Sequence, residues 1–190
     1  MEINLGVIAG LTPSIVLIPF GIKLLKSNTP MNVATWLMWG VLSFVITLSM
    51  FAAGNKDIWL SAGFTLGSVF ISIILLSKGK WSWGYVETIC AVGAAVAMLL
   101  RYYSAPKGAV IACIIAMWLA SIPLLCDLWK QPDPTTWWVW AIITIAAVVT
   151  LITAKAWTIQ DRAFPVSSII FNTLLVVLNL RAVEKPIPAL

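Results

Sequence analysis

Apolar runs of about 20 residues recur from one end of this chain to the other. An α-helix needs roughly that many residues to cross a hydrocarbon core of about 30 Å. The 190 residues contain seven such runs and leave little polar chain that could cover them in water. We therefore predict seven transmembrane helices, at Leu5–Leu25, Val33–Ala53, Ile58–Leu76, Trp83–Leu100, Ala109–Leu128, Trp138–Ala156 and Phe164–Leu180.

The composition excludes the other common fold classes. The chain is 61% hydrophobic and only 10% charged, whereas about a quarter of the residues of a soluble domain are charged. A transmembrane β-barrel would alternate apolar and polar residues in segments of about ten, and the run Ile142–Ile152 does not alternate. The first run lacks a basic leader and is interpreted as a retained helix. The sequence thus predicts an all-α integral membrane protein.

Basic residues fall into two groups when the predicted loops are numbered in order. Their slight imbalance predicts a multi-pass cell-membrane protein, in the inner membrane if bacterial, with its N-terminus outside and its C-terminus in the cytosol. Because they are scattered singly, they form no patch for nucleic acid. The larger group is Lys23, Lys26, Lys78, Lys80, Lys130, Arg181 and Lys185, and the smaller is Lys56, Arg101, Lys107, Lys155 and Arg162.

A faint internal repeat appears at an offset of 104 residues. Four predicted crossings separate equivalent points, and an even number preserves orientation. We therefore predict two parallel three-helix bundles joined by a linker helix, a 3+1+3 plan, with repeats at 1–80 and 105–190 and the linker at 81–104. The residues that match include Pro19 with Pro123, Lys26 with Lys130, Pro30 with Pro134, Trp36 with Trp140 and Asp57 with Asp161.

The residues after the two matched prolines carry a resemblance to a known family. Pro19 leads to Lys23 and Lys26, Pro123 leads to Lys130, and a polar turn follows each. With the 3+1+3 plan, this pattern resembles the SWEET and PQ-loop (MtN3-like) superfamily of transporters. Phe20 and Leu124 stand where that family usually has Gln. Of its paired sugar-binding asparagines, Asn172 is present, and its repeat partner is Ser68.

The resemblance implies a facilitative transporter, or uniporter, that moves a small polar or uncharged solute by alternating access between the two bundles. A sugar is one candidate solute. Two alternatives stay open: a vitamin transporter of the PnuC type, which shares the plan, and a non-transporting receptor or assembly subunit on the same scaffold. The expected partners are the solute and the lipid bilayer, and a homo-oligomer is left open.

Polar side chains within the spans are the candidates for solute contact, because a polar group facing lipid is unfavourable. Asn172 is the strongest candidate, opposite Ser68. For single hydroxyls the alternative is a hydrogen bond to their own helix. Trp36 and Trp140 are interpreted either as anchors at the membrane interface or as a stacking platform for a ring-shaped solute. The remaining candidates are Thr65, Ser43, Thr47 and Thr150.

Four prolines are candidate hinges. Pro19 and Pro123 lie within predicted helices, where each removes a backbone hydrogen bond. They are interpreted either as tolerated kinks or as hinges on which the bundles rock. Pro30 and Pro134 stand near the predicted starts of helices, where proline is favoured, and a structural role is expected first.

Charged residues near the outer helix ends are a candidate gate. Asp57 and Asp161 are expected to complement the positive ends of helix dipoles. Since Lys56, Lys155 and Arg162 share the same predicted outer loops, we also predict cross-repeat ion pairs that close an external gate.

Glu87 is the one acidic residue placed clearly inside a span. It is a candidate intramembrane acid or a residue that reaches the interface. The sequence contains no His, no carboxylate pair within one span and no metal-ligand cluster. Cys90, Cys113 and Cys126 lie singly in apolar runs. We therefore predict no catalytic site, no cofactor, no bound metal and no proton relay.

Overall fold

Eight α-helices make up the part of the chain that a computed structural model describes, residues 5–26, 32–55, 57–78, 83–103 and 106–181. Pro30, Lys56, Lys80 and Lys185 from the predictions above lie outside these ranges. The helices are α1 (Leu5–Lys26), α2 (Val33–Ala52), α3 (Trp59–Ser77), α4 (Tyr85–Tyr103), α5 (Pro106–Ala120), α6 (Ile122–Lys130), α7 (Trp137–Thr153) and α8 (Ile159–Leu180).

The length and polarity of these helices agree with the prediction of a membrane protein. Five described segments are long and apolar enough to cross a membrane: Leu5–Lys26, Val33–Ala52, Trp59–Ser77, Val110–Lys130 and Asp161–Leu180. The fourth segment runs through both α5 and α6. Large apolar side chains on every helix are exposed, among them Ile15, Leu66, Leu99 and Ile145. An all-helical membrane protein is therefore supported.

The fifth predicted span, Ala109–Leu128, is not one helix. It divides at Ser121 into α5 and α6. Pro123 has no N–H to donate to the preceding turn, and the Ser121 hydroxyl donates to the Met117 carbonyl, 2.6 Å away. These two features interrupt the regular hydrogen bonding of the helix at this point.

The last helix begins earlier than the predicted span. The span was predicted from Phe164, with Asp161 at the positive end of the helix dipole, and α8 begins at Ile159. Thr158 caps α8, since its side-chain oxygen accepts from the Asp161 N–H at 3.3 Å. Asp161 lies in the first turn of α8, where an acid is favourable, as predicted.

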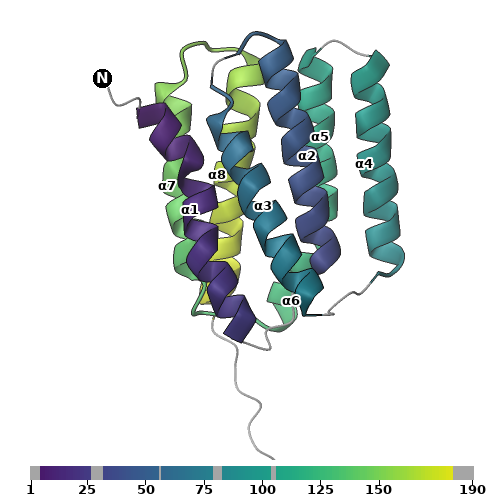
Figure 1. Cartoon of the computed structure of the whole chain (residues 1–190), viewed down its shortest axis with the longest axis vertical. Coiled ribbons are helices and arrows are strands. Elements are labelled where there is room, and N and C mark those ends of the chain that lie inside the picture. The colour runs from purple at the N-terminus through teal and green to yellow at the C-terminus, as the bar shows by residue number, and fades with distance from the viewer. Residues whose placement is uncertain (1–4, 27–31, 56, 79–82, 104–105, 182–190) are drawn as a thin grey trace, which may run out of the picture.

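Helices distant in sequence pack beside one another, and we refer to α1–α3 as the first half and α5–α8 as the second half (Figure 1). Within the first half α3 packs on both α1 and α2, and within the second α8 packs mainly on α7. Between the halves, α1 packs on α7 and α2 packs on α5. α4 packs mainly on α5, at the edge of the molecule.

Candidate binding site

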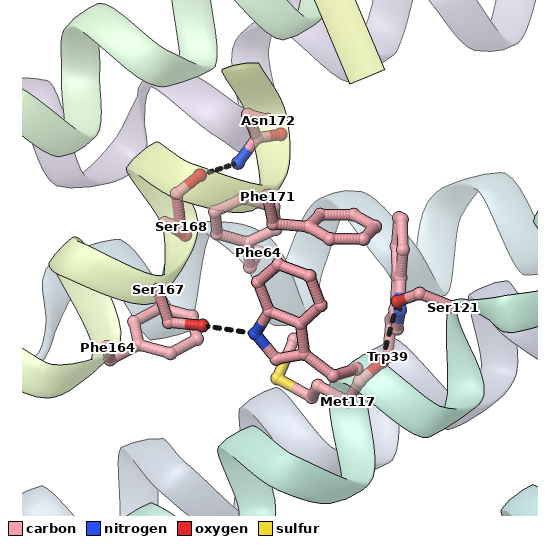
Figure 2. Close-up of a pocket in the computed structure, with 10 residues that line it drawn as sticks. Trp39, Phe64, Met117, Ser121, Phe164, Ser167, Ser168, Phe171 and Asn172 are labelled. Atoms are coloured by element: carbon pink, nitrogen blue, oxygen red, sulfur yellow. Dashed lines mark hydrogen bonds between the residues drawn. The ribbon is translucent and has the colours of Figure 1, made fainter. Parts of the chain in front are cut away.

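A cavity lies where the two halves meet (Figure 2). Its volume is about 30 Å³, enough for about one water molecule. The first half contributes residues from α2 and α3, and the second half contributes residues from α5, α8 and the break before α6. The lining residues are Trp39, Phe64, Met117, Trp118, Ser121, Phe164, Ser167, Ser168, Phe171 and Asn172.

Half of the ten residues that line the cavity are aromatic. Phe64 and Phe164 meet edge to face across the halves, with ring centroids 5.8 Å apart. The ring of Phe171 lies edge to face against Trp39 at 5.4 Å and against Trp118 at 5.2 Å. Such pairs are favourable beyond the apolar area that they bury. The wall therefore offers π faces and edges to a ligand, and none of the residues that line it is charged.

Hydrogen bonds fix the polar groups of the wall. The Trp39 indole N–H donates to Ser121 Oγ, and the Trp118 indole N–H donates to Ser167 Oγ, both at 2.9 Å. The Asn172 side-chain N–H donates to the Ser168 carbonyl at 2.7 Å. Asn172 is 1% exposed, and its Oδ1 accepts no hydrogen bond. Because an unpaired buried acceptor is costly, this oxygen is a candidate acceptor for a hydrogen bond from a ligand.

The predicted solute contacts fall into two groups. Asn172 lines the cavity, whereas Ser68, Ser43 and Trp36 do not. These three are buried and each has a polar side-chain atom without a hydrogen-bond partner, as Asn172 does. The hydroxyls of Thr47, Thr65 and Thr150 donate to the carbonyls four residues earlier in their own helices. For these three, the predicted alternative of a hydrogen bond within the helix is the one that the structure shows.

The interpretation of Trp36 and Trp140 as interfacial anchors is wrong. Their side chains are 1% and 2% exposed, and their rings stack on each other. Phe20 packs against both rings, with centroids 5.9 and 6.0 Å away. The three rings therefore fill the space between α1, α2 and α7. An interfacial anchor would instead have to be exposed at the level of the lipid headgroups.

Sequence reasoning missed the aromatic part of the site. Trp39, Phe64 and Trp118 stood in apolar runs that pointed only to membrane crossing. A signal was available in the last helix, where Phe164, Ser168, Phe171 and Asn172 recur at spacings of three and four residues. That spacing places them on one face of a helix.

The end of the molecule near the start of α8 is closed by hydrogen bonds between the halves. The Asn55 side chain donates to Asp161, and the Lys155 backbone N–H donates to Asp57 at 3.1 Å. Arg162 instead donates to the carbonyls of Ala154 and Ala156 in its own half. Within the described part of the chain, Asp57 and Asp161 form no ion pair with Lys155 or Arg162, because the backbone carbonyls exposed after α7 bind the guanidinium.

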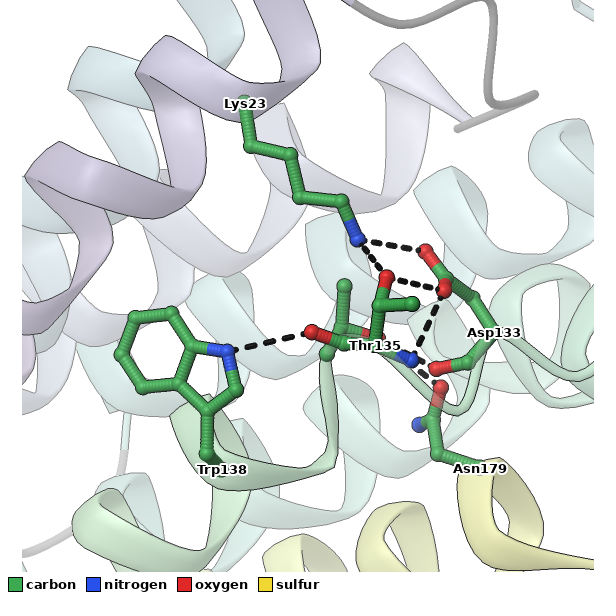
Figure 3. A network of polar contacts seen from close by, with 6 residues as sticks. Lys23, Asp133, Thr135, Trp138 and Asn179 are labelled. Carbon is green, nitrogen blue, oxygen red and sulfur yellow. Dashed lines mark hydrogen bonds and ion pairs between the residues drawn. The ribbon is translucent and has the colours of Figure 1, made fainter.

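The opposite end is closed by an ion pair (Figure 3). Lys23 Nζ lies 3.0 Å from Asp133 Oδ2 and also donates to the Thr135 hydroxyl. Within the same loop, Asp133 Oδ1 accepts from the Thr135 backbone N–H at 3.0 Å. Burial raises the pKa of Asp133, but the bonds from Thr135 and Lys23 outweigh it, so the pKa lies below its ordinary value. The contact between Lys23 and Asp133 was not predicted.

The candidate hinge prolines occupy unlike positions. Pro19 lies within the unbroken helix α1, on its exposed side. Pro123 is buried and stands at the start of α6, just after the break. Pro134 lies in the turn between Asp133 and Thr136, where the Thr136 N–H donates to the Asp133 carbonyl at 3.1 Å. It therefore shapes a turn, a role that its fixed φ suits, and does not begin α7.

Glu87 joins α4 to the start of α2. Its carboxylate accepts from the Asn32 side chain at 2.5 Å and from the Gly84 N–H at 2.9 Å. Asn32 in turn caps α2 by accepting from the Thr35 N–H at 3.2 Å. Glu87 is 9% exposed and does not line the cavity. Its contacts are those of a residue that positions helices.

Among the residues described by the structure, the side chains of His, Cys, Asp and Glu nowhere form a group of three that could hold a metal ion. Comparisons of the chain with models of protein families, with curated proteins and with solved structures find no match.

Proposed function

We propose that this chain crosses a membrane seven times and is a facilitative transporter for a small uncharged solute. The observation that carries the proposal is the cavity that both halves line, in which the buried Asn172 Oδ1 has no donor. Hydrogen bonds near one end of the molecule and an ion pair near the other join the two halves. A buried site between two bodies that touch at each end is the arrangement that alternating access requires.

The bounds of the helices support a 3+1+3 plan. α1 ends at Lys26 and α6 at Lys130, and α2 begins at Val33 and α7 at Trp137. Both pairs are separated by the 104 residues of the sequence repeat. The packing of α1 on α7 and of α2 on α5 is also reciprocal under that repeat. On this plan α5 and α6 form one crossing, and α4 is the linker.

The contacts at the two ends are weak enough to serve as gates. An ion pair that is partly exposed, such as Lys23 with Asp133, contributes only about 0–1 kcal/mol. The bonds of Asn55 and Asp57 at the other end join the halves without a described ion pair. In the transport cycle, one end would open while the other stays closed, so the solute in the cavity would be exposed to one side at a time.

Transport is tested by reconstituting the purified chain into liposomes and measuring uptake of a panel of radiolabelled uncharged solutes. Saturable uptake that equilibrates without an ion gradient is expected. Asn172→Leu should reduce it about tenfold or more, because a hydrogen bond to the solute is lost. The control Thr173→Val alters an exposed neighbour on the same helix and should leave uptake unchanged. Binding without flux would instead identify a receptor.

The parallel arrangement is tested by labelling of single cysteines. In a chain whose native Cys90, Cys113 and Cys126 are replaced by serine, Lys26→Cys and Lys130→Cys should react with an impermeant maleimide from the same side of the membrane. Lys155→Cys should react only from the other side. Labelling of positions 26 and 130 from opposite sides would overturn the 3+1+3 plan, and the side itself tests the proposed orientation.

A further inference from the structure

The two halves differ in how closely their helices pack. In the first half, α1 and α3 approach at Gly10, Gly63 and Gly67. A Cβ on Gly63 would lie 2.2 Å from the Gly10 carbonyl oxygen, and one on Gly67 would lie 2.4 Å from Leu17 Cδ1. Only glycine permits this approach.

The equivalent positions in the second half carry side chains, and the helices there pack less closely. Under the offset of 104 residues, Gly10 corresponds to Ile114, Gly63 to Ser167 and Gly67 to Phe171. Between α5 and α8 lies an open apolar groove of about 320 Å³, the size of a small-molecule site. It is lined by Ile111, Ile114, Ile115, Trp118, Ala163, Val166, Ser167 and Ile170.

Trp118 and Ser167 separate this groove from the cavity. Both residues line the groove and the cavity, and the bond between their side chains spans from α5 to α8. Trp118 is half-buried. A rotation of its indole into the groove would break the hydrogen bond to Ser167 and enlarge the cavity that Asn172 also lines.

We propose that Trp118 is a lateral gate through which a small, uncharged aromatic solute with one N–H or O–H donor enters the cavity from the bilayer. The aromatic wall suits a ring, and Asn172 Oδ1 accepts from its donor. The groove is apolar and would face lipid, where an aromatic solute dissolves, whereas polar contacts join the halves near both ends of the molecule. This inference rests on the proposed transport function and specifies its solute and route.

Binding of radiolabelled indole to the full chain in lipid nanodiscs tests the solute class without requiring flux. Wild-type protein should bind indole saturably, and N-methylindole, which has no donor, should bind about fivefold more weakly. Asn172→Leu should bind the two compounds equally. If wild-type protein does not bind indole while liposomes show saturable flux of another solute, the inference fails and transport stands. Equal binding of the two compounds by wild-type protein would also overturn it.

The route is tested by the rates of indole binding and release. Trp118→Phe removes the bond to Ser167 and should speed both rates, whereas Trp129→Phe, at an exposed tryptophan of α6, should not. Ala163→Trp fills the groove and should slow both rates about tenfold, and Ile145→Trp, at an exposed position of α7, should not. If Ala163→Trp does not fold, the Trp118→Phe result decides. Rates equal to those of the controls would exclude the lateral route.

Discussion

The indole rings of Trp36 and Trp140 stack on each other with centroids 6.1 Å apart and 26° between their planes. Trp36 and Trp140 are each the fourth residue of their helices, α2 and α7, and each is almost fully buried. On the proposed 3+1+3 plan, this contact would lie on the axis that relates the two halves. The contact joins the two halves by burying apolar surface. It is separate from the polar contacts that join the halves near the two ends.

Loss of this contact should be costly. Trp140→Ala is expected to lower the free energy of unfolding by about 3–5 kcal/mol, since it removes a large buried side chain and leaves a cavity. Trp137→Ala, one turn earlier on α7 and 41% exposed, is the matched control and should cost much less. Thermal unfolding of both variants in the same detergent measures the difference. Equal losses would show that the stacked pair has no special role.

The ion pair of Lys23 with Asp133 should make stability depend on acid pH. The pKa of Asp133 is lower in the folded chain than its ordinary value of 3.8. The ionised Asp133 side chain therefore contributes its full stabilisation when the pH is above its ordinary pKa. This stabilisation is lost as the pH falls through the pKa that Asp133 has in the folded chain. The loss should be about 0–1 kcal/mol. The free energy of unfolding, measured between about pH 5 and pH 2, should show this pH-dependent loss in wild-type protein and not in Asp133→Asn.

The two equivalent prolines should differ in their effect on transport. Pro123 stands at the break between α5 and α6, next to Ser121, which bonds to Trp39 of the other half. Pro123→Ala allows the helix to continue and should slow solute uptake several-fold while the protein stays folded. Pro19→Ala, in the unbroken and exposed part of α1, should change uptake little. Equal uptake by the two variants would refute the hinge at Pro123.

Close packing of α1 on α3 should not tolerate a side chain at Gly63. In Gly63→Ala the new Cβ would meet the rigid Gly10 carbonyl, so the helices must separate, and the expected cost is about 1–3 kcal/mol. Gly40→Ala is the control, because its Cβ would meet the end of the Val69 side chain at 3.3 Å, which can shift. Thermal unfolding of the two variants should separate them, and similar midpoints would contradict the close approach.

Glu87 should act in folding and not in proton coupling. Glu87→Ala leaves the Asn32 side chain and the Gly84 N–H without their shared acceptor, and should lower the free energy of unfolding by about 1–3 kcal/mol. Glu87→Gln should lower the free energy of unfolding by less than Glu87→Ala does. Uptake measured with and without an imposed pH gradient should respond alike in wild-type protein and Glu87→Gln. Uptake driven by the gradient in wild-type protein alone would identify Glu87 as a proton carrier.

Local properties of the chain were readable from sequence. The apolar runs predicted the helices, because the thickness of a bilayer sets their length, and the bounds of α1, α2 and α3 agree within one residue at each end. Asn172 was predicted as a buried polar contact for the same local reason, since an amide within an apolar run needs a partner. The break at Pro123 and the cap at Thr158 had local causes that were visible, yet their effects on helix bounds were not predicted.

The tertiary structure alone decided which side chains meet. Trp39, Phe64 and Phe171 come from three helices, and each run of apolar residues is compatible with many helix rotations, so the cavity wall could not be derived from them. The partners of Lys23 and Asp161 were likewise decided by loop geometry, which sequence distance does not report. Spacing along the chain determines what each helix can bury, and only the packing of helices determines what lies across from it.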